Sequence, residues 1–201
     1  EQKIESTKKF LSKLWNVSRF LSSFPVIDSG VPTDTDKWIL SELDKLVKEC
    51  KKGYEEYNFF IPAVAIREFT WNVFAAHYIE MVKARAYGID FSDEERDGAI
   101  FTLHKTLSTI LKLLAPITPF ITEHLWKTLY SNESIHQQKQ VDFENIEEQT
   151  EITKAISEFN SKVWNEKKSQ NLSLKDSIKI DIPEILQPFK KDLKSMHNLL
   201  D

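Results

Sequence analysis

The stretch NFFIPAVAIREFTWNVFAAHYIEMVKARAYG, residues 58–88, predicts the centre of the fold. Ile66, Phe69 and Val73 recur at helical spacing, and large apolar side chains occupy the other sides of the same helix. A helix that is apolar nearly all round is a buried one. Gly88 suits the C-terminal cap of such a helix. The stretch therefore predicts a central helix against which the other helices pack.

Amphipathic stretches on both sides of this segment predict more helices. Helices are expected over about 3–24, 34–57 and 92–131, the last broken at Pro116 and Pro119 because proline removes a donor and clashes with the preceding turn. Ser92 and Glu95 have the spacing of a capping box. The first helix buries the stripe Phe10, Leu14, Val17, Leu21 and Phe24, and the tryptophans Trp71, Trp126 and Trp164 are expected in the core.

The second half of the chain predicts a smaller unit. Residues 131–148 are polar and read as a linker, and a further helix carries apolar residues in register from Ile152 to Val163. SIKIDI, residues 177–182, alternates as a half-buried strand does, and residues 183–200 close the chain as a helix. The fold class is mainly α: an antiparallel helical bundle at 1–130, the linker, and a small α/β appendage at 149–201.

Composition excludes several classes of protein. The 201 residues are 41% hydrophobic and 29% charged, with four glycines, which suits a helical globular chain. A single cysteine, Cys50, excludes an internal disulfide and fits the reducing cytoplasm. No segment reads as membrane-spanning or as a signal peptide. Because the chain opens with Glu1 in a helix-like stretch, we expect a piece of a longer protein.

Catalytic motifs are missing from the sequence. It contains no G-x-G-x-x-G, P-loop or G-x-S-x-G pattern, and its five histidines are scattered without metal-site spacing. Lysines near Cys50 favour a lowered thiol pKa, but we predict that Cys50 is an unreactive helix residue. We therefore expect no catalytic residue, no metal and no cofactor in this chain, and binding becomes the better hypothesis.

Charge is distributed unevenly along the chain. The net charge is -4, which argues weakly against a general nucleic-acid binder. Residues 1–24 nevertheless carry five Lys or Arg against two Glu, whereas residues 133–151 carry six acidic residues against one Lys. A basic first helix and an acidic linker are thus concealed in the total.

The polar face of the first helix is the main candidate site. Lys13, Asn16 and Arg19 are three residues apart, so they lie close together on a helix surface. The full set is Lys8, Lys9, Ser12, Lys13, Asn16 and Arg19, and Phe24 at the helix end offers a surface for an unstacked base. Lysines attract phosphates, and Asn, Ser and Arg read base edges or sugars. Composition alone favours the alternative, a solvated helix face with Phe24 in the core.

A second basic cluster lies near the predicted strand. Lys167, Lys168 and Lys175 surround a turn and are candidates for contacts with a nucleic-acid backbone. Lysines beside a strand also serve solubility, so both interpretations remain open.

Four motifs in order resemble one family. KKFLSKLWNVSRF (8–20), DKWILSEL (36–43), FTWNVFAAHYIEMVKARAY (69–87) and LLAPITPFITEHLW (113–126) are similar to successive helices of the anticodon-binding domain of class I aminoacyl-tRNA synthetases, in the valyl, isoleucyl and leucyl group. The later FNSKVWNEKKSQNLSLKDSI (159–178) and LQPFKKDLKSMHNL (186–199) resemble the C-terminal part of archaeal-type valyl enzymes. The resemblance covers nearly the whole chain.

The resemblance implies a role in tRNA recognition. The parent enzyme would attach valine to its tRNA with ATP, and this C-terminal fragment would hold the anticodon arm. Motifs like HIGH and KMSKS are absent, so the ATP site, like the catalytic and editing domains, would lie elsewhere in the parent. Family contacts map onto Lys8, Lys9, Ser12, Lys13, Asn16 and Phe24, with Arg19 at phosphate or bracing the bundle. Lys167, Lys168 and Lys175 remain candidates for contacts with the tRNA backbone.

Two alternatives remain from the sequence. The same domain could come from an isoleucyl, leucyl or methionyl enzyme, because the bundle is shared. A structural helical bundle that binds protein is also consistent with the acidic total and the many aromatic residues. The sequence predicts tRNA binding, a cytoplasmic location and no membrane contact.

Overall fold

The computed structural model describes residues 2–139 and 149–200, and this part of the chain is mainly α-helical, as predicted. Its first seven elements are α1 Gln2–Leu21, α2 Asp34–Glu55, α3 Phe60–Glu68, the π-helix η1 Phe69–Tyr78, α4 Ile79–Ala86, α5 Asp93–Leu114 and α6 Pro119–Leu129. The later elements are the 3-10 helices η2 Ile135–Gln137 and η3 Glu184–Phe189 with the helices α7 Thr150–Ser169 and α8 Lys190–His197.

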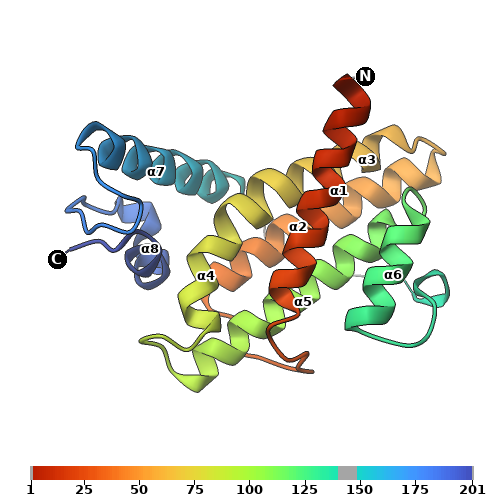
Figure 1. Cartoon of the computed structure of the whole chain (residues 1–201), viewed down its shortest axis with the longest axis horizontal. Coiled ribbons are helices and arrows are strands. Elements are labelled where there is room, and N and C mark those ends of the chain that lie inside the picture. The colour runs from red at the N-terminus through yellow and green to blue at the C-terminus, as the bar shows by residue number, and fades with distance from the viewer. Residues whose placement is uncertain (1, 140–148, 201) are drawn as a thin grey trace.

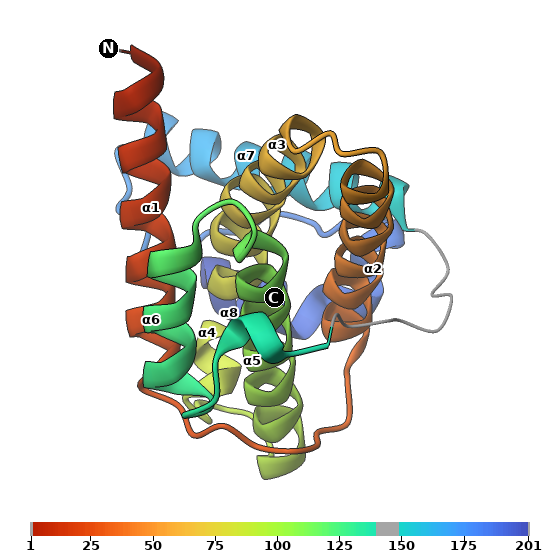
Figure 2. The ribbon, with the colours of Figure 1, turned by 90° about the vertical axis from the view of Figure 1, so that its right-hand side faces the viewer.

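The helices surround one continuous rod. α3, η1 and α4 follow one another without a break, and α1, α2 and α5 pack along them (Figure 1). α7 and α8 lie together at one end of the long axis, and α6 lies toward the other. In Figure 2, α1 forms one edge of the bundle and α2 the opposite edge. The outer side of α1 therefore faces away from the bundle.

The rod is the buried centre that residues 58–88 predict. Ile66, Phe74, Tyr78 and Met81 are all 0% exposed. The middle third is a π-helix, a rare form that is frequently found at functional sites. The wide apolar side of the rod thus contacts several helices at once, while Arg67, Glu68 and Asn72 form an exposed polar stripe.

Local signals place the helix ends close to their predicted positions. The Ser92 hydroxyl accepts from the Glu95 N–H, and the Glu95 carboxylate accepts from the Ser92 N–H at 2.9 Å, so the capping box is confirmed. α2 is capped by Thr33, directly before the predicted start of this helix at residue 34. Gly88 adopts φ +70° just after α4, a conformation that favours glycine.

A buried ionic cluster joins the helices α2, α4 and α8. The Arg85 guanidinium on α4 donates to both carboxylate oxygens of Asp36 on α2, at 2.7 and 2.8 Å, and to Asp192 on α8 at 3.1 Å. The Tyr78 hydroxyl also donates to Asp36, at 2.6 Å. Arg85 is 1% and Asp36 0% exposed. Hydrogen bonds and charge from these carboxylates raise the pKa of Arg85 despite its burial.

We expect Arg85→Met to destabilise the protein by about 3–5 kcal/mol, because it leaves two buried carboxylates without their cation. Lys37→Met is the matched control: it removes only the exposed pair with Asp34, which should change stability by less than about 1 kcal/mol. Urea unfolding of both variants measures the difference. Equal losses in the two variants would contradict the importance of the cluster.

The strand predicted at 177–182 is wrong. Among the residues that the structure describes, this segment forms only one isolated bridge, between Ile178 and Leu199. The Leu200 N–H donates to the Ile178 carbonyl at 3.0 Å, and no ladder extends beyond it. Ile178 is buried and Ile180 and Ile182 are partly buried, so the alternation reflects packing of an extended segment against the core. Apolar residues at every second position indicate that one side of an extended segment is buried, but they do not show that the segment pairs with another strand.

The predicted linker is partly attached to α6. Ile135 is 3% exposed, and the Glu123 carboxylate accepts from the Ile135 N–H at 2.9 Å and from the Ser134 hydroxyl at 3.0 Å. Residues 140–148 of this linker lie outside the described residues.

A second buried polar chain crosses from the rod to the last helix. The Asn160 amide on α7 donates to His77 Nδ1 at 3.0 Å, and its carbonyl accepts from His197 Nε2 at 2.8 Å. Burial, together with the charge of Lys167 and the proximity of His77, lowers the pKa of His197 to about 4. Both histidines are therefore neutral in the folded protein at pH 7.

These neutral histidines predict acid sensitivity. Between the ordinary pKa of 6.5 and about 4, His197 binds a proton in the unfolded chain but not in the folded one, so stability falls as the pH falls through this window. The contribution of His197 is roughly 3 kcal/mol. We expect His197→Gln to be less stable at pH 7 but to show a shallower loss from pH 6.5 to 4, measured by unfolding at each pH. Identical slopes would contradict the assignment.

No helix in the described residues has the length and apolar character needed to cross a membrane.

Candidate nucleic-acid interface

The first helix is amphipathic as predicted, and its buried side fixes which residues face outward. Phe10, Leu14, Val17 and Leu21 are at most 6% exposed and pack into the core. Because these residues recur every three or four positions, the polar residues between them are directed away from the core. Lys8, Lys9, Ser12 and Asn16 are exposed, and Lys13 is half-buried.

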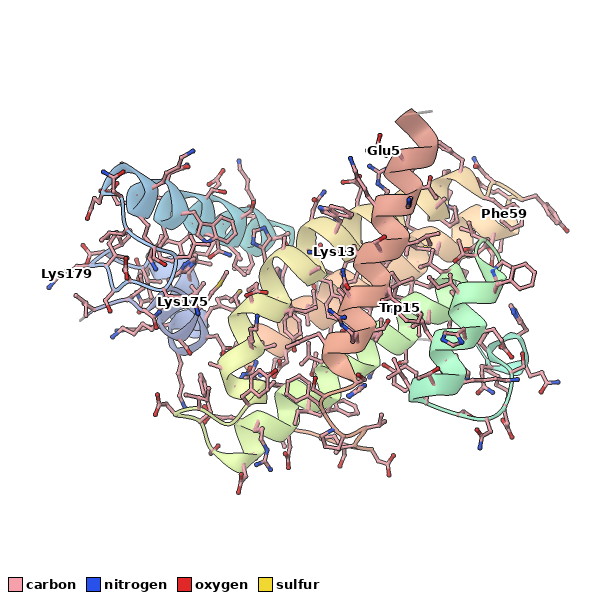
Figure 3. All side chains as sticks on the ribbon, in the orientation of Figure 1. Glu5, Lys13, Trp15, Phe59, Lys175 and Lys179 are labelled. Carbon is pink, nitrogen blue, oxygen red and sulfur yellow. The ribbon has the colours of Figure 1, made fainter. Side chains whose placement is uncertain are left out.

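Five of the predicted site residues surround one depression. The depression lies between α1 and η1 and has a volume of about 460 Å³. It is lined by Glu5, Lys8, Lys9, Ser12, Lys13, Asn16 and Trp71. Three lysines thus lie beside polar side chains that hydrogen-bond in two directions and beside an indole ring. Figure 3 shows Lys13 on the side of α1 that faces the rod. The geometry suits an anionic ligand that carries flat rings.

The prediction that Trp71 lies in the core is wrong. Trp71 is 37% exposed, and Lys13 Nζ lies 5.7 Å from the centre of its ring, within cation–π range. The sequence contained the signal: Trp71 lies three and four residues after Glu68 and Arg67, so it shares their exposed helix face. The apolar residues all round the segment obscured this polar stripe.

Lys9 is only weakly engaged within the protein. Its ammonium lies 2.9 Å from the Glu5 carboxylate, but both side chains are 66% exposed. Exposed pairs of this kind contribute little to stability and are screened by salt. Lys9 can therefore exchange Glu5 for a phosphate at low cost.

Phe24 is buried, so the prediction that it stacks on a base is wrong. It is 7% exposed, and its ring centre lies 5.3 Å from that of Phe20 and 5.0 Å from that of Tyr87. The Phe24 carbonyl lies 3.2 Å from His104 Nε2. The helix ends at Leu21, and the turn after it folds Phe24 back into the core. Arg19 is exposed but does not line the depression.

The prediction that Lys167 contacts a nucleic-acid backbone is also wrong, because its side chain is buried at 1% exposure. Its ammonium donates to the carbonyls of Leu174 and His197, both at 2.7 Å, and burial lowers its pKa. It therefore holds the turn after α7 against the end of α8. Lys168 and Lys175 are exposed, so only these two members of the second basic cluster can reach a nucleic-acid backbone.

Trp126, in contrast, is buried at 6% exposure as predicted, and Trp164 is half-buried. Cys50 is also buried, and burial raises the pKa of its thiol to about 12, so it is an unreactive core residue.

Comparison with known proteins identifies the family. Residues 36–182 match the model of the anticodon-binding domain of tRNA ligase. The chain belongs to this family of anticodon-binding domains. The candidate residues on α1 precede the matched span.

Relatives cover the whole chain, α1 included. The present chain is 36% identical to the valine–tRNA ligase of Aeropyrum pernix over 98% of the present chain. It is 37% identical to the valine–tRNA ligase of Pyrobaculum aerophilum over 100% of the present chain. The valine–tRNA ligase of Nanoarchaeum equitans is 34% identical over 99% of the chain. The chain spans about a quarter of the length of these relatives. The resemblance to archaeal-type valyl enzymes is thereby confirmed.

We expect Phe24→Ala to destabilise the fold by about 3 kcal/mol, because it leaves a cavity among Phe20, Tyr87 and the end of α1. The affinity of the folded variant for RNA should stay unchanged. Thermal unfolding and RNA titration, each compared with Phe120→Ala at a 91% exposed position, measure the two effects. A variant of normal stability that loses RNA affinity would restore Phe24 to the site.

Proposed function

We propose that the outer face of α1, together with Trp71, binds the anticodon arm of a tRNA. The observation that carries this proposal is that five predicted polar residues and an exposed indole surround one depression. Membership in the anticodon-binding family supports tRNA as the class of ligand.

The chemistry of the depression suits the loop of the arm rather than its duplex. Lysines attract phosphates without regard to sequence, while Asn16 and Ser12 can hydrogen-bond to base edges or sugars. A base in a loop is free to leave its neighbours and stack on an aromatic ring, whereas a paired base is not. Trp71 supplies such a ring beside the cation of Lys13.

The whole protein is proposed to be a valine–tRNA ligase. The relatives described above carry this name and support valine over isoleucine, leucine or methionine. On this proposal, the parent protein attaches valine to its tRNA with ATP in the cytoplasm. Activation of valine and editing take place in other domains, and the present chain contributes recognition. ATP would bind outside residues 1–201.

Lys13→Ala and Asn16→Ala are each expected to weaken binding of valine tRNA by about 1–3 kcal/mol, because each removes a contact to phosphate or base. Trp71→Ala should cost a similar amount through lost stacking. Filter binding or fluorescence anisotropy with the 201-residue chain and valine tRNA measures these losses. The affinity should also fall as salt rises, and less steeply for Lys13→Ala than for the unaltered protein.

Lys52→Ala provides the matched control, since Lys52 is an exposed lysine on α2, at the opposite edge of the bundle. It should leave the affinity within about twofold of the original value. Unchanged affinity for tRNA in Lys13→Ala, Asn16→Ala and Trp71→Ala would refute this assignment of the interface. Tight capture of a protein partner with no preference for tRNA over other RNA would instead support a protein-binding bundle.

A further inference from the structure

The side of α1 turned away from Trp71 carries a second depression. It is lined by Thr7, Lys8, Leu11, Ser12, Trp15 and Asn16. Figure 3 shows Trp15 on the side of α1 toward α6, whereas Lys13 lies on the other side of the same helix. The second depression is more apolar than the first, because Leu11 and the Trp15 indole form part of its wall. It therefore suits a flat, weakly polar group.

The Trp15 indole is held in place by a ring from another helix. The His124 imidazole on α6 stacks on it, with ring centres 5.6 Å apart and planes inclined by 7°. Trp15 nevertheless remains 44% exposed, and His124 is exposed as well. An exposed tryptophan whose orientation is fixed in advance loses little conformational entropy on binding a further ring. The stack thus leaves a ready aromatic surface at the edge of α1.

The two depressions share a common ridge. Lys8, Ser12 and Asn16 line both of them, and these residues follow one another at intervals of four along α1. Each depression adds one exposed indole to this ridge, Trp71 on one side and Trp15 on the other. A strand of RNA whose phosphates follow the ridge would pass both indoles.

We propose that α1 separates two unstacked nucleotides of the bound RNA loop, with one base against Trp71 and the other against Trp15. This inference rests on the proposed function and specifies how the same interface holds its RNA. A helix with its side chains is about 10–12 Å across, so bases on its two sides cannot stack on each other. The loop is therefore bound in a splayed form.

Asn16 gains a defined role from this arrangement. Its amide lines both depressions and carries a donor and an acceptor, so it can contact the edge of either base. Stacking on the two indoles is tolerant of sequence, because every base has a π-face. Discrimination between bases then falls to the polar ridge rather than to the aromatic rings.

A double-mutant cycle tests the separation of the two bases. The binding of the full chain to a valine tRNA anticodon stem–loop is measured for the original protein, Trp15→Leu and Trp71→Leu. Each protein is titrated with the intact RNA and with RNAs that lack one base, position by position around the loop. A tryptophan and the base that it stacks on behave non-additively, because removing either already loses the contact.

We expect Trp15→Leu to weaken binding of the intact RNA about tenfold and to have no effect on the RNA lacking one particular base. Trp71→Leu should behave in the same way toward a different base. Trp15→Phe should recover most of the affinity. Phe120→Ala removes an exposed aromatic ring from α6, the helix that carries His124, and should have none of these effects. Thermal unfolding confirms that each variant is folded.

Two results would overturn the inference while leaving the proposed function intact. In the first, the RNA binds and depends on Lys13, but Trp15→Leu changes only the melting temperature, so that the ring stack serves only to attach α6 to α1. In the second, both tryptophans couple to the same base. An RNA that fails to bind the original protein, or that binds independently of Lys13 and Asn16, would instead refute the proposed function.

Discussion

The guanidinium of Arg85 is the group on which the arrangement of the chain depends. It is almost completely buried, and a guanidinium removed from water is destabilising unless carboxylates or other hydrogen-bond acceptors replace its hydration. Asp36 and Asp192 come from helices far apart in the sequence, so satisfying Arg85 requires α2 and α8 to meet at α4. The cluster therefore links the bundle to the last helix and leaves few alternative packings for either.

This constraint determines which surfaces remain for a partner. The rod of α3, η1 and α4 is contacted by α2, α5, α7 and α8, and α1 packs on a further side of η1, where its stripe of apolar residues adds to the core. The outer face of α1 is then open along much of its length. A helix placed in this way presents polar residues at intervals of three and four, which suits contact with a flexible, charged strand. The exposed indoles beside it add surfaces for flat rings.

Much of the fold was predictable because its signals are local. Apolar periodicity located the helices, and residue spacing located the capping box at Ser92 and the glycine after α4. The polar residues of α1 were predictable for the same reason, since the stripe from Phe10 to Leu21 fixes the opposite face. The strand at 177–182 failed, because pairing needs a second extended segment beside the first, and here a single bridge is formed.

The errors within the site have two causes. The exposure of Phe24 and Lys167 depends on neighbours distant in the sequence, whereas the exposure of Trp71 also follows a local polar stripe with Arg67 and Glu68 that the surrounding apolar residues obscured. The turn after α1 packs Phe24 against Tyr87, and Lys167 donates a hydrogen bond to the His197 carbonyl. The indole of Trp71 remains partly exposed beside α1. None of these neighbours can be recognised from the local pattern.

The sequence alone specified the helices, the polar face of α1 and the family resemblance, because each is encoded in residues close together along the chain. The association of Arg85 with Asp36 and Asp192, and of Lys13 with Trp71, emerged from the packed structure. The same holds for the stacking of Trp15 on His124. Helix periodicity gives the direction in which a side chain points, but the identity of what it meets depends on how separate helices pack.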